Sequence, residues 1–193
     1  MELTARQAQL ADVGLRLVAR EGMASVTFRA IASESGWSLG AVQKAFPSKE
    51  AILRAMFARL RTTSVALPPD EPGRPTLRAW LAELLLRLLP LDEPRRTALL
   101  KGSAFAERAA YDAELAAAIA ASDAELRRLL GALVRRAQAE GELDEALEPD
   151  LVARAFLALA TGLATQCLYE PLDEAAARRL AQDAVARLTS PIV

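Results

Sequence analysis

Histidine is absent from this chain of 193 residues, and cysteine occurs once, at Cys167. The chain therefore offers no Ser-His-Asp or Cys-His nucleophile, no histidine pH switch, no intrachain disulfide and no ordinary zinc site. No glycine-rich phosphate loop occurs either. Cys167 stands in an apolar stretch and is predicted to be a small core residue. We predict that the protein is not an enzyme and holds no metal and no cofactor.

A long hydrophobic run is also missing. The longest stretch without a charged residue, 155–169, has 15 residues, fewer than the roughly 20 apolar residues that span a bilayer. The amino-terminal MELTARQAQL does not follow the basic-then-apolar plan of a signal peptide. We expect a soluble cytoplasmic protein that does not contact the membrane.

Aromatic residues make up only 5% of the chain, whereas hydrophobic residues make up 52%, mostly alanine and leucine. This usage favours helices over strands, and no stretch alternates with period two. The charges are unevenly distributed. Residues 1–61 hold nine basic and five acidic residues, while residues 62–193 hold fifteen basic and twenty acidic residues. Only the amino-terminal part has a balance that attracts phosphates.

The most informative segment is TFRAIASESGWSLGAVQKAF, which begins at Thr27. Thr27 can cap a first short helix, Gly36 allows the positive φ of a sharp turn, and Ser38 can cap a second helix. Val42 and Phe46, four residues apart, give that helix an inward face and leave the outer face slim and polar. This is the arrangement that lays a second helix in the DNA major groove.

On the outer face, Gln43 could offer its amide to an adenine, and the methyl group of Ala41 could touch a thymine methyl. Ile31 and the small Ala32 would face inward where the two short helices cross. The alternative is a surface helical hairpin whose small residues only permit close packing.

The flanking sequence extends this pattern on both sides. Thr4 and Gln7 form a capping-box pair at the start of an amphipathic helix, which ends at Gly22. Ser48 then caps a further helix that runs to about residue 63. The first helix carries an apolar stripe that can cover the two short helices, and the further helix carries an apolar side that is expected to be buried.

An amphipathic helix ending in Gly22, two short helices, and F-x-S-K-E at the start of a long helix together resemble the amino-terminal domain of TetR-type transcriptional regulators. The resemblance spans about residues 5–60, and more loosely the later helical layout and residues 141–166. The chain departs from the usual pattern at two positions: Gln43 replaces an aromatic residue, most often tyrosine, and Ala45 replaces an aromatic residue or histidine. The contacts of those rings are not carried over.

The resemblance implies that the partner is double-stranded DNA, contacted from the two short helices and the start of the next. The implied contact residues are Thr27, Arg29, Ser38, Leu39, Gly40, Ala41, Gln43, Lys44 and Lys49. Physical chemistry supports the charged members, because Lys49 lies at a helix amino terminus, where backbone N–H groups favour a phosphate. Arg29, in the first turn of its helix, can reach a phosphate or a base.

Proline and glycine interrupt the helical pattern over residues 67–75, at or soon after the end of the amino-terminal unit. Beyond it, the pattern predicts helices near residues 76–89, 92–109, 112–140, 149–168 and 173–189. The expected fold is all-α, with about nine helices. We predict a helix-turn-helix DNA-binding domain over 1–47, a connecting helix over 48–63, and a larger effector-binding and dimerisation domain over 64–193.

The predicted helix 149–168 is apolar almost all round, so a second chain is a natural cover for it, and the alternative is a central helix in a monomer. Small residues on this helix and apolar ones on the last helix are the predicted dimer interface: Ala155, Ala158, Gly162, Thr165, Leu180, Ala184 and Leu188. TetR-type proteins dimerise in this way. A two-fold homodimer would bind a palindromic operator.

The larger domain is also the expected site of a small-molecule effector, apolar or amphipathic in character. The candidate pocket residues are Phe57, Trp80, Ser103, Phe105, Phe156 and Gln166, although such residues equally suit an ordinary core. These expectations together describe a ligand-responsive repressor. The alternative is a helical ligand-binding dimer without sequence-specific DNA binding, for which Gln43 and Ala45 are the hint.

Overall fold

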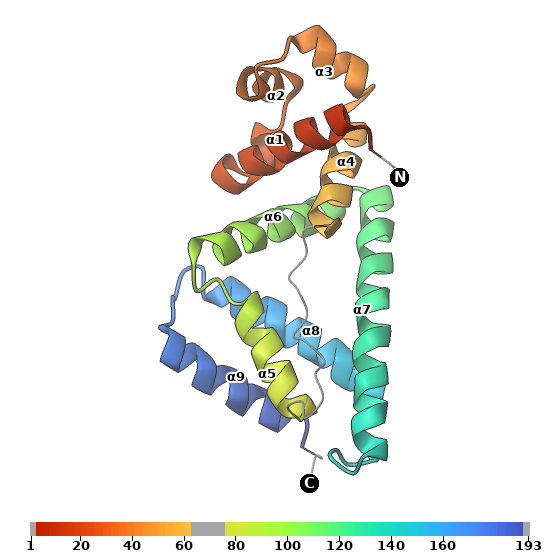
Figure 1. The fold of residues 1–193 in the computed structure, drawn as a ribbon, viewed down its shortest axis with the longest axis vertical. Helices are drawn as coiled ribbons and strands as arrows, with labels where there is room; N and C mark the ends of the chain where they lie inside the picture. The colour runs from red at the N-terminus through yellow and green to blue at the C-terminus, as the bar shows by residue number, and fades with distance from the viewer. Residues whose placement is uncertain (1–2, 63–75, 191–193) are drawn as a thin grey trace. The chain divides into compact units, whose positions relative to one another are not determined.

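The computed structural model describes residues 3–62 and 76–190, which fold into helices with no strand among them (Figure 1). The elements are α1 (Ala5–Glu21), the 3-10 helix η1 (Met23–Ser25), α2 (Phe28–Ser35), α3 (Leu39–Ala45), α4 (Lys49–Thr62), α5 (Leu77–Leu88), α6 (Glu93–Ala109), α7 (Ala113–Ala139), α8 (Pro149–Gln166) and α9 (Glu174–Leu188). The predicted all-α fold is confirmed. None of these described helices is long and apolar enough to cross a bilayer. The proline-rich segment 67–75 and the predicted boundary at residues 63 and 64 lie outside the described residues.

The chain divides into two compact units. The first consists of Met1–Ser64 and Leu100–Ile119, and the second of Val65–Leu99 and Ala120–Val193. Helices α6 and α7 therefore each belong partly to both units. The sequence did not indicate that residues 100–119 group with the amino-terminal helices.

Helix α1 forms the centre of the first unit, since it packs against η1, α2, α3 and α4. Its inner side contributes Leu10 and Val18 to a core shared with Ile31 and other residues of the neighbouring helices. At Gly14 the packing with α4 is so close that an added Cβ would lie 2.6 Å from the sulfur of Met56. Dense packing of this kind fixes the position of α4 on α1.

The predicted helix caps are all present in the first unit. The hydroxyls of Thr4, Thr27, Ser38 and Ser48 each accept a hydrogen bond, at 3.0 to 3.2 Å, from the backbone N–H three residues further on. The capping box at Thr4 is complete. Gly36 has the left-handed φ of 73° that the sharp turn after α2 requires. The short helices therefore begin and end where the sequence predicts.

In the second unit α5 packs against α8 and α9, around a core of leucine, alanine and a few aromatic residues. Two polar contacts hold the start of α5. The carboxylate of Glu142 accepts hydrogen bonds from the backbone N–H groups of Leu77 and Arg78, at 2.8 and 3.1 Å, and Arg78 donates to Thr189 at the end of α9. Cys167 is buried after α8, as predicted, and burial raises the pKa of its thiol.

Candidate nucleic-acid interface

Helix α3 separates an apolar side from a polar one. Val42 and Phe46 are buried, and they anchor the helix to the core of the first unit. The opposite side is open to solvent, with Gln43 and Lys44 exposed and Leu39 at 36%. Since the remaining outward positions are Gly40 and the partly buried Ala41, this side is as slim and polar as predicted.

Three exposed cations lie on α3 or near it along the chain: Arg29 on α2, Lys44 on α3, and Lys49 at the start of α4. No hydrogen bond or ion pair engages their side chains within the described residues. Their charges are therefore available to an external anion such as a phosphate. The predicted contacts Thr27 and Ser38 are also exposed, and both cap helices with their hydroxyls.

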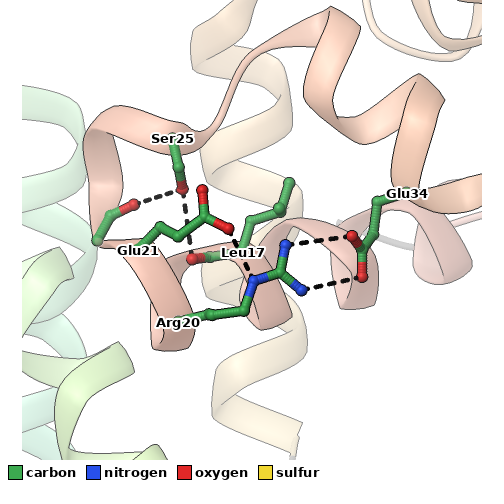
Figure 2. Close-up of polar contacts among 6 residues, drawn as sticks. Leu17, Arg20, Glu21, Ser25 and Glu34 are labelled. Carbon is green, nitrogen blue, oxygen red and sulfur yellow. Dashed lines mark hydrogen bonds and ion pairs between the residues drawn. The ribbon is translucent and has the colours of Figure 1, made fainter.

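The carboxyl end of α1 is attached to α2 by an ion pair (Figure 2). The guanidinium of Arg20 donates to both oxygens of Glu34, at 3.4 and 3.2 Å, and to Glu21 at 2.7 Å. The hydrogen bonds with Glu34 raise the pKa of Arg20, and those with Arg20 lower the pKa of Glu34. Beside them, the hydroxyl of Ser25 donates to the carbonyl oxygens of Gly22 and Leu17, which fixes the turn after α1 (Figure 2).

The middle of α1 is attached to α4 by a second ion pair. Arg59 donates through two nitrogens to the two carboxylate oxygens of Asp12, each at 2.9 Å. Such a paired geometry resists rotation better than a single contact. The hydrogen bonds with Asp12 raise the pKa of Arg59.

The amino end of α1 contacts the residue before the α3 cap and the last residue of α3. The side-chain amide of Gln7 donates to the carbonyl oxygen of Ala45 at 3.0 Å. The guanidinium of Arg6 lies over the ring of Trp37, 3.9 Å from its centre. The sequence identified Gln7 only as a capping residue. No local pattern could reveal a partner 38 positions away.

The candidate pocket residues are distributed over the two units. In the first unit Phe57 and Phe105 have ring centroids 5.7 Å apart, and Ser103 is exposed. In the second unit Trp80 and Phe156 belong to the core, and Gln166 is exposed. Neither unit gathers all six residues, so an effector pocket built from them remains a prediction.

The predicted dimer residues on α8 lie mainly on its open side. Ala158, Gly162 and Thr165 are exposed, whereas Ala155 is partly buried, as are the α9 residues Leu180, Ala184 and Leu188. Two large residues that were not predicted are exposed near the start of α8 and just after its end. They are Leu151, 62% exposed, and Tyr169, 72% exposed. Phe156 and Ala160 are buried on the other side, so α8 is apolar over most of its surface, apart from the exposed Arg154, and its own chain covers one side of it.

A capped helix-turn-helix with a slim polar second helix and exposed cations defines a DNA-binding protein of the helix-turn-helix class. Residues 10–56 match the family model of bacterial regulatory proteins of the tetR family. Residues 75–190, more than half of the chain, match the model of the carboxyl-terminal region of BetI-type transcriptional repressors. The chain belongs to the TetR family, and it is a DNA-binding transcriptional regulator.

The relatives agree with this assignment along most of the chain. The nicotine-responsive transcriptional repressor HdnoR of Paenarthrobacter nicotinovorans is 27% identical over 173 residues, 87% of this chain and 86% of the relative. A TetR-family regulator from Rhodococcus sp. shares the fold with a TM-score of 0.77 at 22% identity, over 96% of this chain and 98% of that one. A regulator from Saccharomonospora viridis in complex with choline has a TM-score of 0.74 at 20% identity, over 94% of each chain.

Proposed function

We propose that this regulator acts as a homodimeric, ligand-responsive repressor that binds a palindromic operator. The observation that carries the proposal is the open side of α8, where the large Leu151 and the small Ala158, Gly162 and Thr165 are exposed together with one charged residue, Arg154, and where Tyr169 is exposed just after the helix ends. Apolar surface of this kind gains free energy when a second subunit covers it. The small residues allow the backbones of two helices to approach closely.

Each subunit of such a dimer contributes one α3 to the DNA. Arg29, Lys44 and Lys49 neutralise phosphates and position the protein on the duplex. Gln43 reads one base edge through its amide, and Leu39 and Ala41 offer apolar contact to a thymine methyl. Two copies related by a dyad then read two inverted half-sites about one helical turn, or a small multiple, apart.

The effector in this proposal is an apolar or amphipathic small molecule. Two relatives support an organic ligand, since one is named as nicotine-responsive and the structure of another contains choline. The ligand favours an arrangement of the dimer whose two α3 helices no longer match the operator spacing. By linkage, saturating operator must weaken ligand binding by the same factor as the ligand weakens operator binding. Equal ligand affinity with and without operator would remove this mechanism.

The direct test is a selection of bound sequences from random duplexes with the full chain. We expect enrichment of an inverted repeat, because two equivalent α3 helices impose the symmetry of the dimer on the site. The same selection with Gln43→Ala should change the base preference at one position in each half-site. Enrichment of a sequence without two-fold symmetry would contradict the proposal that a homodimer binds a palindromic operator. Enrichment of no sequence would favour the alternative, a ligand-binding dimer without sequence-specific DNA binding.

A further inference from the structure

We infer that the first turn of α1 is a positioning element for the recognition helix α3, and that Gln7 sets the selectivity of DNA binding without touching DNA. Gln7 holds the carbonyl oxygen of Ala45, the last residue of α3, at 3.0 Å. Its neighbour Arg6 stacks on Trp37, the residue directly before the α3 cap Ser38. Both ends of the recognition helix are thereby attached to one turn of α1.

A helix as short as α3 depends on such attachments. It spans only Leu39–Ala45, and a segment of this length has too few internal hydrogen bonds to be stable alone. The carbonyl groups of its last turn have no partner within the helix. The amide of Gln7 supplies one for Ala45 in a partly buried location. The direction of the end of α3 therefore follows the position of the Gln7 side chain.

The chemistry of Gln7 is specific to an amide. Its Oε1 accepts hydrogen bonds from the backbone N–H and the hydroxyl of Thr4, both at 3.1 Å, while its Nε2 donates to Ala45. Because the two donors of Thr4 face one end of the amide and the carbonyl acceptor of Ala45 faces the other, the positions of Oε1 and Nε2 are fixed. A glutamate at this position would keep the capping box, since its carboxylate accepts from Thr4. It could not donate to Ala45.

The position of Ala45 connects this contact to DNA reading. Gln43 and Lys44 immediately precede Ala45 on the exposed side of α3. A flexible lysine tolerates a small tilt of the helix and still reaches a phosphate, whereas an amide that reads a base edge needs defined geometry. Loss of the Gln7 contact should therefore reduce selective binding more than non-selective binding. This inference rests on the proposed reading of an operator by α3.

The test compares Gln7→Glu with Gln9→Glu in the chain of 193 residues. Gln9 is exposed on the same helix, and its side chain has no partner among the described residues, so the control adds the same charge without breaking a contact. The measurement is the ratio of affinities for a duplex enriched by the wild type and for a shuffled duplex. We expect this ratio to fall about tenfold in Gln7→Glu, with a lowered Tm because the carbonyl group of Ala45 loses its donor, and to stay within about twofold of the wild type in Gln9→Glu.

Two further variants separate positioning from stability. Gln7→Met removes the donor without adding a charge and should also lower the ratio, while Ser25→Ala removes hydrogen bonds to the carbonyl groups of Gly22 and Leu17 and should lower Tm but leave the ratio unchanged. A ratio in Gln7→Glu and Gln7→Met equal to that of the wild type would overturn the inference. A wild type that enriches no duplex would instead contradict the proposed operator reading, so the two failures are distinguishable.

Discussion

The open sides of α3 and α8 differ in almost every physical respect. The α3 side is polar, and Arg29, Lys44 and Lys49 on or beside it are unpaired within the described part of the chain. The α8 side is mostly small and apolar, with Arg154 as its exposed charge, and the large residues Leu151 and Tyr169 are exposed near the start of the helix and just after its end. Counterion release favours a nucleic acid at the first surface, and burial of apolar area favours a protein at the second. Salt should therefore weaken binding at one surface and leave the other nearly unaffected.

The largest effect is expected when the α8 side is given a charge. Gly162→Glu places a carboxylate in the proposed dimer interface, and a buried unpaired charge should weaken dimerisation by more than about 100-fold. The change is tolerated by the subunit itself, because a Cβ at Gly162 meets no described atom within 4 Å. Analytical ultracentrifugation of the wild type and the variant measures the difference.

The matched control is Gly102→Glu on α6. A Cβ at this glycine also meets nothing within 4 Å in the described chain, and Gly102 is exposed on a helix that does not belong to the proposed interface. The control should dimerise like the wild type. If Gly162→Glu dimerises with the same affinity as the control, α8 does not form the dimer interface. The contrast between a DNA-binding surface on α3 and a protein-binding surface on α8 would then be wrong for α8.

An intermediate effect is expected at the other surface. The double variant Lys44→Ala and Lys49→Ala removes two proposed phosphate contacts, so affinity for a bound duplex should fall about 10- to 100-fold at low salt. Log affinity falls as log salt concentration rises, and the steepness of this fall should be smaller by about two in the double variant.

A charge-matched control for this experiment lies in the same unit. Arg16→Ala with Lys101→Ala removes two positive charges outside α2, α3 and the start of α4. Its affinity should stay within about threefold of the wild type, with an unchanged salt slope. If both double variants lose affinity equally, the cations act through net charge and not through defined contacts.

The smallest effect concerns the ion pair between Arg20 and Glu34 in the first unit. Arg20 lowers the pKa of Glu34 below its ordinary value of 4.5, so the pair contributes stability above that value and loses it as the pH falls through the lowered pKa. Glu34→Gln should reduce Tm by on the order of 1 °C at pH 7, because the side chains of Arg20 and Glu34 are 55% and 30% exposed and water screens the pair. The difference should disappear at acidic pH and in high salt. A difference that persists under acid would exclude the ion pair as its cause.

The parts of the fold predicted from sequence are those encoded by local chemistry. Thr27 and Ser38 cap helices because their hydroxyls reach the N–H three residues further on, and Gly36 ends α2 because it alone takes a positive φ at no steric cost. The spacing of Val42 and Phe46 likewise indicates which side of α3 is buried. Each of these signals lies within four residues of the structure it determines.

The parts that sequence did not predict depend on contacts between distant segments. Gln7 and Ala45, or Arg20 and Glu34, meet only after the chain has folded back on itself. The sequence also did not predict that Tyr169 is exposed, since an aromatic residue after an apolar helix suits a core as well as a surface. The candidate pocket stays a prediction for a related reason, because apolar composition alone does not distinguish a cavity lining from ordinary packing.

The single cysteine has a practical consequence for observing this protein. Cys167 is buried and its thiol has a raised pKa, and only the thiolate reacts with alkylating reagents. Labelling of the native chain must therefore wait for the second unit to open, and its rate reports that opening directly. A cysteine introduced on the open side of α3 or α8 would react first. Cys167 thus serves as an internal chemical probe of local opening in the second unit. A second cysteine can be introduced and labelled at the surface without first replacing Cys167.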